Sequence, residues 1–173
     1  MTEAKYIWMD GNFVEWNDAK VHVLSHTLHY GNGAIEGTKA YKTHDGRCAI
    51  FKLKEHTKRL LNSSKMTLMD VPFSEDDLNK AQVELLQIQL RNLWLSRKLI
   101  VYLGYGVMGL YHKDCPVNVS ISARKWGAYL GEEGLKKGIR LKISSMTRTP
   151  NTSSMGKAKA VANYLNSQMA KYE

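Results

Sequence analysis

The feature that most constrains the fold is a strict alternation of apolar and polar side chains at residues 117–123. Its apolar members are Val117, Val119, Ile121 and Ala123, and its polar members are Asn118, Ser120 and Ser122. Successive side chains of a strand point to opposite faces of a sheet, so this stretch predicts a strand with one buried face. The rest of the chain is therefore expected to cover that face.

Turn signals predict two β-hairpins earlier in the chain. Asp10-Gly11-Asn12 separates the aromatic and β-branched runs 6–9 and 13–16, and His44-Asp45-Gly46 separates residues 34–41 from 48–53. Glycine tolerates the positive φ that tight turns need, so each pair of runs can fold back on itself. Residues 98–105 are mostly apolar and predict a further strand.

Two helices are expected between the second hairpin and this strand. Residues 55–66 place Leu60, Leu61 and Ser64 inward at helical spacing. After Pro72, Ser74 can cap a second helix. The apolar positions that recur in this second helix are Leu78, Ala81, Leu85 and Ile88. The second helix is expected to pack on the sheet.

These elements indicate an α+β fold class. Residues 1–126 are expected to form an N-terminal domain with helices on one face of an antiparallel sheet, and residues 127–131 are expected to be an interdomain linker. Residues 132–173 are expected to begin a second domain, with a strand at 139–143 and a helix at 161–171. One strand and one helix cannot bury a core, so this α/β domain is expected to be truncated.

The charge of the chain suggests two classes of partner. Its 173 residues include 25 Lys and Arg against 16 Asp and Glu, which gives a formal net charge of +9. Such an excess of positive charge favours binding of nucleic acid, but it also favours binding of anionic small molecules such as phosphates and carboxylates. The basic residues are scattered and lack the interleaved aromatics of a base-stacking surface. No nucleic-acid partner is therefore expected, and a non-enzymatic basic module is the less favoured alternative.

Other features indicate a soluble cytoplasmic protein. No apolar run is long enough to span a membrane, and the first residues lack a signal-peptide core, so no membrane partner is expected. Cys48 and Cys115 are far apart and fit two reduced thiols. His22, His26 and His29 would share one face of a helix, but no carboxylate or cysteine joins them, so no metal site is predicted.

The stretch from Met155 to Tyr164 has the character of a site for a covalent lysine. It places Lys157 and Lys159 among glycine and alanine residues. A lysine that forms a Schiff base must be partly desolvated, and small neighbours let a flat cofactor lie close to the backbone. The alternative is a pair of exposed lysines at the start of an alanine-rich helix.

A series of short motifs occurs in order along the whole chain. They are Tyr6-Ile7-Trp8, Lys20-Val21-His22-Val23, Ser25-His26, Leu28-His29-Tyr30-Gly31, Glu36-Gly37, Glu55-His56 with Arg59-Leu60, Trp126-Gly127-Ala128-Tyr129-Leu130-Gly131, and Lys159-Ala160 with Asn163-Tyr164-Leu165. This series resembles the N-terminal half of the branched-chain amino acid aminotransferases, in the D-amino acid aminotransferase-like fold. The resemblance implies transamination of leucine, isoleucine and valine with 2-oxoglutarate, pyridoxal 5′-phosphate as the cofactor, and a second domain of pseudo-barrel form.

The resemblance assigns roles around the cofactor. Lys159 is implied to be the catalytic lysine that binds the cofactor and moves the substrate proton, Arg59 to bind the cofactor phosphate, and Tyr164 to contact the pyridoxal 3′ oxygen. Lysines two residues apart cannot both face one pocket, so Lys157 is implied to be solvated.

The implied substrate pocket must accept an aliphatic side chain and, in the second half-reaction, the carboxylate of glutamate. The substrate-binding residues implied by the resemblance are Tyr30, Ile35, Gly37, Arg97, Trp126 and Tyr129. Aromatic walls suit the aliphatic chain, and Arg97 and the Tyr30 hydroxyl can receive the carboxylate. Tyr30 is implied to reach the site of a partner subunit, so a homodimer or higher homo-oligomer is expected.

The chain departs from the family pattern in places. Ile35 stands where many members carry phenylalanine, Lys39 where they carry arginine, and Leu95 where they carry tyrosine. The family's carboxylate that pairs with the pyridine nitrogen lies beyond position 173, so the chain alone is expected to be inactive. A D-amino acid aminotransferase and an aminodeoxychorismate lyase, both of the same fold, stay open as alternatives.

Overall fold

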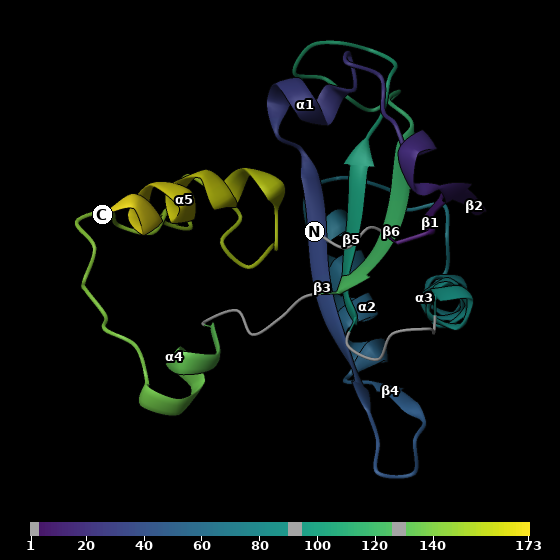
Figure 1. Ribbon diagram of the computed structural model, residues 1–173. Coiled ribbons are helices and arrows are strands. Elements are labelled where there is room, and N and C mark those ends of the chain that lie inside the picture. The colour runs from purple at the N-terminus through teal and green to yellow at the C-terminus, as the bar shows by residue number, and fades with distance from the viewer. Residues whose placement is uncertain (1–3, 90–94, 126–130) are drawn as a thin grey trace.

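The computed structural model of the protein describes residues 4–89, 95–125 and 131–173. Its centre is a six-stranded antiparallel sheet in the order β2-β1-β6-β5-β3-β4 (Figure 1). The strands are β1 (Tyr6–Met9), β2 (Asn12–Glu15), β3 (Gly33–Lys42), β4 (Cys48–Ile50), β5 (Leu95–Leu103) and β6 (Val117–Lys125). Both expected hairpins, β1–β2 and β3–β4, are confirmed.

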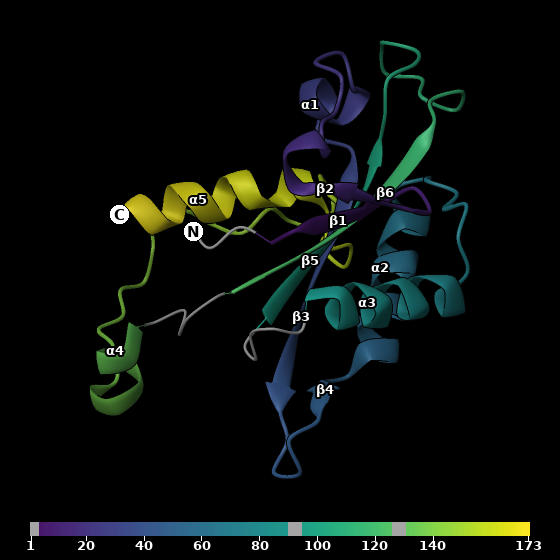
Figure 2. The ribbon, with the colours of Figure 1, turned by 45° about the vertical axis from the view of Figure 1, so that its right-hand side comes forward.

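The helices lie on both sides of this sheet. They are α1 (His26–Tyr30), α2 (Leu53–Met66), α3 (Glu75–Gln89), α4 (Gly131–Lys137) and α5 (Tyr164–Tyr172), with short 3₁₀ turns at Trp16–Asp18 and Val161–Asn163. Helices α2 and α3 lie on one side of the strands, and α4 and α5 lie on the other (Figures 1 and 2). None of the helices that the structure describes combines the length and the apolarity needed to cross a bilayer.

The core lies between the sheet and the helices α2 and α3. Leu60 of α2 and Leu85 of α3 are fully buried there, together with Val119 and Ile121 of β6. The alternation at residues 117–123 is thus confirmed, since its polar members face away from this core. Burial of such aliphatic side chains is the main favourable term in folding.

The second helix begins at the predicted cap. The backbone N–H of Asp77 donates to Ser74 Oγ at 3.2 Å, and the backbone N–H of Ser74 donates to Asp77 Oδ2 at 3.0 Å. This reciprocal pair satisfies two N–H groups at the helix start, as in a capping box. Ile88, near the other end of α3, is 47% exposed, so the apolar stripe of this helix does not reach the core along its full length.

The prediction of a strand at residues 139–143 is wrong. Ile139, Leu141 and Ile143 lie in an irregular segment after α4, and Ile143 is 96% exposed. A strand needs a hydrogen-bonded neighbour, and no described residue pairs with this segment. The linker expected at 127–131 lies outside the described residues except for Gly131, which begins α4.

The register of β3 against β5 defines the two faces of the sheet. Ile35 lies opposite Ile100, Gly37 opposite Lys98, and Thr38 opposite Arg97. Directly paired residues of antiparallel strands point to the same face. The face away from α2 and α3 therefore carries Ile35, Gly37, Ile100 and Lys98, and it is partly open.

Candidate active site

The segment that carries Lys159 pairs with the edge of β3. Ala160 forms an antiparallel bridge with Ala34, and the backbone N–H of Ile35 donates to the Lys159 carbonyl at 2.9 Å. The Lys159 backbone N–H donates to Ser63 Oγ of α2 at 3.1 Å. The backbone of Lys159 is thus fixed by both the sheet and a helix, which suits a residue whose side chain must be placed accurately.

The alanines beside Lys159 are buried. Ala158 and Ala160 are 4% and 7% exposed, and the small Ala160 pairs directly with Ala34 of β3. Ala158 also lines the cavity that contains the Lys159 side chain. Small side chains at these positions therefore let the segment approach β3 closely.

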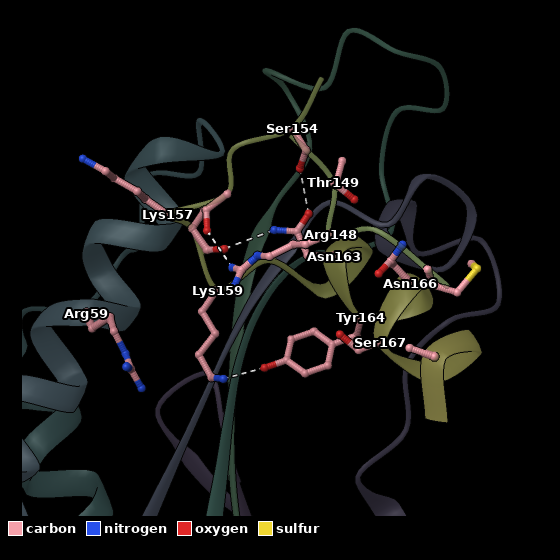
Figure 3. A pocket seen from close by; sticks show the side chains of 14 residues that line it. Arg59, Arg148, Thr149, Ser154, Lys157, Lys159, Asn163, Tyr164, Asn166 and Ser167 are labelled. Carbon is pink, nitrogen blue, oxygen red and sulfur yellow. Dashed lines mark hydrogen bonds between the residues drawn. The ribbon is translucent and has the colours of Figure 1, made fainter. Parts of the chain in front are cut away.

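The two lysines point in different directions. Lys159 is partly buried, and its Nζ donates to the Tyr164 hydroxyl at 2.5 Å (Figure 3). Lys157 is exposed, and its amine extends away from this pair. Because Lys159 lies opposite Ile35 in the pairing, its side chain is on the open face of the sheet.

A cavity of about 580 Å³ surrounds the Lys159 amine. Arg59 of α2 contributes one wall, and Tyr164 and Asn163 at the start of α5 contribute another (Figure 3). The remaining lining comes from residues 146–170, including Arg148, Ser154 and Ser167. A cavity of this size is in the range of small-molecule and cofactor sites.

The side chains around this cavity fit pyridoxal phosphate. A primary amine, a phenolic hydroxyl and a guanidinium converge there from Lys159, Tyr164 and Arg59. An amine can bind an aldehyde carbon, a phenol can hydrogen-bond a ring oxygen, and a guanidinium can contact phosphate oxygens. The structure thus brings together the three residues that the family resemblance assigned to the cofactor.

Glu36 holds Arg59 in place through a contact that no local sequence pattern indicates. The Glu36 carboxylate is 1% exposed, and it accepts hydrogen bonds from Arg59 Nε and Nη2 at 2.6 and 2.7 Å. It also accepts from the Gly37 backbone N–H at 2.8 Å and lies 3.3 Å from His56 Nδ1. Burial raises the pKa of Glu36, but these hydrogen bonds and the nearby positive charge outweigh it, so its pKa lies below the ordinary value.

Glu36→Gln is expected to lower the free energy of unfolding by about 1–3 kcal/mol at neutral pH, because a buried charged acceptor is lost. The folded pKa of Glu36 is lowered, so its contribution is present above the ordinary value of 4.5 and is lost as the pH falls through the folded pKa. Urea denaturation across the acid range measures both effects. Glu84→Gln in α3 is the control, and an equal loss in that variant would contradict the assignment.

The expected substrate residues divide into separate groups. Ile35 and Gly37 lie on the open face that also carries Lys159. Tyr30, at the end of α1, stacks on His26 at a centroid distance of 4.5 Å and lines a neighbouring groove with Ala160 and other residues, not the cavity around the Lys159 amine. Trp126 and Tyr129 lie outside the described residues.

Arg97 is not on the face that carries Lys159. It is fully buried on the side of α2 and α3, and its Nε donates to Thr38 Oγ1 at 2.8 Å. Its Nη1 and Nη2 have no hydrogen-bond partner among the described residues. Burial lowers the pKa of Arg97 to about 10. The structure thus separates Arg97 from Ile35, Gly37 and Lys159, against the expectation of a shared pocket.

The three histidines do not share one helix. His26 and His29 lie on α1, and His22 precedes it. His26 Nε2 hydrogen-bonds the Gly109 carbonyl at 2.7 Å, and His29 Nε2 hydrogen-bonds the Val23 carbonyl at 2.9 Å. Within residues 4–89, 95–125 and 131–173, no group of three or more His, Cys, Asp and Glu residues is arranged to hold a metal ion.

Comparisons with known proteins extend over nearly the whole chain. Residues 33–173 match the family model described as amino-transferase class IV. The chain is 43% identical to the branched-chain-amino-acid aminotransferase of Pseudomonas aeruginosa over 168 residues, which covers 96% of this chain and 54% of that relative. It is 41% identical to the protein of the same name from Escherichia coli K12 over 172 residues, which covers 95% and 53%.

Solved structures agree with this match. The crystal structure of the T.th. branched-chain amino acid aminotransferase with pyridoxamine 5′-phosphate superimposes with a TM-score of 0.91 at 42% identity, and the match covers 99% of this chain and 56% of that one. The Escherichia coli enzyme structure gives a TM-score of 0.90 at 39% identity and covers 96% and 54%. The chain spans about half the length of the curated relatives it matches.

Proposed function

The chain belongs to the class IV aminotransferases, and from that premise we propose that it supplies the cofactor-binding lysine of a branched-chain amino acid transaminase. The proposed reaction moves the amino group of leucine, isoleucine or valine to 2-oxoglutarate, giving branched-chain 2-oxo acids and glutamate. The observation that carries the proposal is the cavity in which Lys159, Tyr164 and Arg59 meet. The names of the similar proteins support the choice of substrates.

Pyridoxal phosphate, when bound, supplies an electron sink for the bond that breaks at the substrate α-carbon. The Lys159 amine is proposed to anchor it and then to carry the proton that leaves that carbon. A lysine can do this because its neutral amine accepts a proton and its ammonium returns it. The Tyr164 hydroxyl, at 2.5 Å from the amine, orients Nζ within the cavity.

Arg59 is proposed to bind the cofactor phosphate. Its Nε and Nη2 donate to Glu36, which fixes the plane of the group, and Nη2 also lies 3.4 Å from His56 Nδ1. The N–H donors of Nη1 are proposed to contact the anion. Hydrogen bonding to Glu36 raises the pKa of Arg59, so its positive charge is secure at any physiological pH. The geometry suits a phosphate because a fixed guanidinium can make two parallel contacts with phosphate oxygens.

The test is a panel of amino donors given to the full-length protein with pyridoxal phosphate and 2-oxoglutarate. Leucine, isoleucine and valine are expected to produce glutamate, and D-alanine is expected to produce little. Activity confined to D-alanine would assign the chain to the D-amino acid aminotransferases instead. A protein that binds nucleic acid with steep salt dependence and transfers no amino group would favour the basic binding module.

A homodimer or higher homo-oligomer is proposed as the working state. Large apolar side chains are exposed around α1 and in the loop after β5, at one end of the sheet; they include Val23, Leu28, Leu110 and Tyr111. Leu110 is 87% exposed, and apolar groups gathered in this way mark association surfaces. Light scattering of the full-length protein measures its oligomeric state, and a monomer at assay concentrations would contradict the proposal.

A cytoplasmic location is also proposed, and cell fractionation tests it.

A further inference from the structure

The side chain of Asn163 makes two hydrogen bonds within the loop that carries Lys159. Its Nδ2 donates to the Ala158 carbonyl at 3.2 Å, and its Oδ1 accepts from Ser154 Oγ at 2.7 Å (Figure 3). Ala158 directly precedes Lys159, and Asn163 directly precedes Tyr164. One side-chain amide therefore joins the backbone beside the Lys159 amine to the backbone beside the Tyr164 hydroxyl.

The two contacts together select one orientation of the Asn163 amide. A carbonyl oxygen only accepts hydrogen bonds, so the Ala158 carbonyl requires the NH₂ group of Asn163. The amide oxygen then faces Ser154, whose hydroxyl donates to it. A flipped amide would place its oxygen against the Ala158 carbonyl oxygen, which has no proton to donate.

Asn163 precedes helix α5 at the N-cap position but does not cap it. An asparagine at this position commonly accepts a hydrogen bond from a backbone N–H of the first turn, which stabilises the helix. Within the described chain, the Asn163 side chain makes no such bond, and its oxygen accepts from Ser154 instead. The side chain therefore serves the Lys159 loop and not the helix.

Polar contacts set the position of Tyr164 more than packing does. None of residues 164–172, all of which the structure describes, is buried. The backbone of Lys159, in contrast, has its own supports, because its N–H donates to Ser63 and its carbonyl accepts from Ile35. The polar contact nearest to Tyr164 in the chain is that of Asn163, so this amide links the supported lysine to the less supported phenol.

The same amide separates two hollows of the surface. Ser154 and Asn163 line both the cavity around the Lys159 amine and the neighbouring groove beside Tyr30. Their hydrogen bond is therefore part of the wall between the cavity and the groove. Loss of the amide is expected to open this wall and to expose the Lys159 amine from a second side.

We propose that Asn163 is a positioning residue of the transamination: it holds the Lys159 amine and the Tyr164 hydroxyl at their 2.5 Å separation, and Ser154 sets the orientation of its amide. This inference rests on the proposed function, because it assigns Asn163 a role in the proton transfer at Lys159. A group that moves a proton must stand within hydrogen-bond reach of the atom concerned. A misplacement of about 1 Å can cost about 10²-fold in rate.

Asn163→Ala in the full-length protein tests the proposal. The kcat with leucine is expected to fall about 10- to 100-fold while the KM for leucine stays within about twofold, because Asn163 acts through Lys159. Asn163→Asp is expected to lose as much, since a carboxylate has the same shape but cannot donate to the Ala158 carbonyl. Asn62→Ala, an exposed change on α2, is the control and should keep the wild-type kcat.

A pair of variants at Ser154 tests the orientation of the amide. Ser154→Ala is expected to lower kcat about three- to tenfold, which is the contribution of one hydrogen bond. Ser154→Thr keeps the hydroxyl and is expected to restore most of the rate. Equal losses in the two variants would show that the Ser154 hydroxyl does not orient Asn163.

A labelling experiment tests the same contact without turnover. Formaldehyde and cyanoborohydride methylate accessible amines of the cofactor-free full-length protein, and mass spectrometry compares Lys159 with the exposed Lys157. The ratio of Lys159 to Lys157 labelling is expected to rise at least about threefold in Asn163→Ala, because a loosened loop exposes the Lys159 amine. The ratio in Asn62→Ala should equal that of the wild type.

Three results would overturn the role of Asn163. They are an unchanged labelling ratio in Asn163→Ala, a kcat in that variant equal to that of the wild type, and a wild-type kcat in Asn163→Asp. If the wild-type protein transfers no amino group, the proposed function fails separately. The labelling ratio then still decides whether Asn163 holds the Lys159 amine in place.

Discussion

Lys159→Ala in the full-length protein is expected to lower the rate of transamination by about 10² to 10⁴-fold, which is the usual contribution of a positioned acid–base group. The variant lacks the only amine that points into the cavity toward Tyr164 among the described residues. It also lacks the amine that is proposed to anchor the cofactor. The rate of glutamate formation from leucine and 2-oxoglutarate measures the loss.

The neighbouring lysine provides the control for this variant. Lys157 is exposed and points away from the Lys159 and Tyr164 pair, so Lys157→Ala should retain most of the wild-type activity. A second measurement does not depend on turnover: borohydride reduction of the cofactor-loaded protein should leave a stable mass increase on the peptide that contains Lys159. A mass increase on the Lys157 side chain, or none on either, would refute the assignment.

Arg97→Met is expected to raise the free energy of unfolding by about 1–4 kcal/mol, because it replaces a buried cation by an apolar side chain of similar length. Burial lowers the pKa of Arg97 to about 10, and two of its nitrogens lack partners among the described residues. This lowering of the pKa corresponds to roughly 3 kcal/mol of destabilisation while Arg97 is charged in both the folded and the unfolded state.

The destabilisation caused by the buried Arg97 charge becomes smaller as the pH rises. Above about pH 10 the folded chain releases the Arg97 proton, while the unfolded chain, in which the pKa of Arg97 is higher, still holds it. The unfolded state binds more protons there, so stability rises with pH in that window, and below it the cost is constant. Urea denaturation at neutral pH measures the gain. Lys54→Met, an exposed change on α2, is the control, and a less stable Arg97→Met would contradict the interpretation.

Much of the fold could be predicted because its signals are local. The alternation at 117–123, the two glycine-containing turns and the Ser74 cap each depend on residues a few positions apart. Residues 139–143 show the same kind of alternation, but no other segment of the described chain pairs with them, and they do not form a strand. Periodicity reports which face of a strand could be buried, and pairing decides whether the strand forms.

The site was harder to predict because its contacts are long-range. The pairing of Glu36 with Arg59 joins a strand to a helix 23 residues away, and no local pattern indicates it. The face of the sheet on which Arg97 lies depends on the register of β5, because a shift of one residue moves a side chain to the other face.

The pairing of the Lys159 segment with β3 also has a consequence for the behaviour of the chain in solution. An unpaired strand edge exposes N–H and C=O groups on which a strand from another molecule can add. The bridge between Ala34 and Ala160, with the hydrogen bond from Ile35 to Lys159, occupies that part of the β3 edge. The segment that carries Lys159 therefore also keeps this part of the β3 edge from pairing with a strand of another molecule.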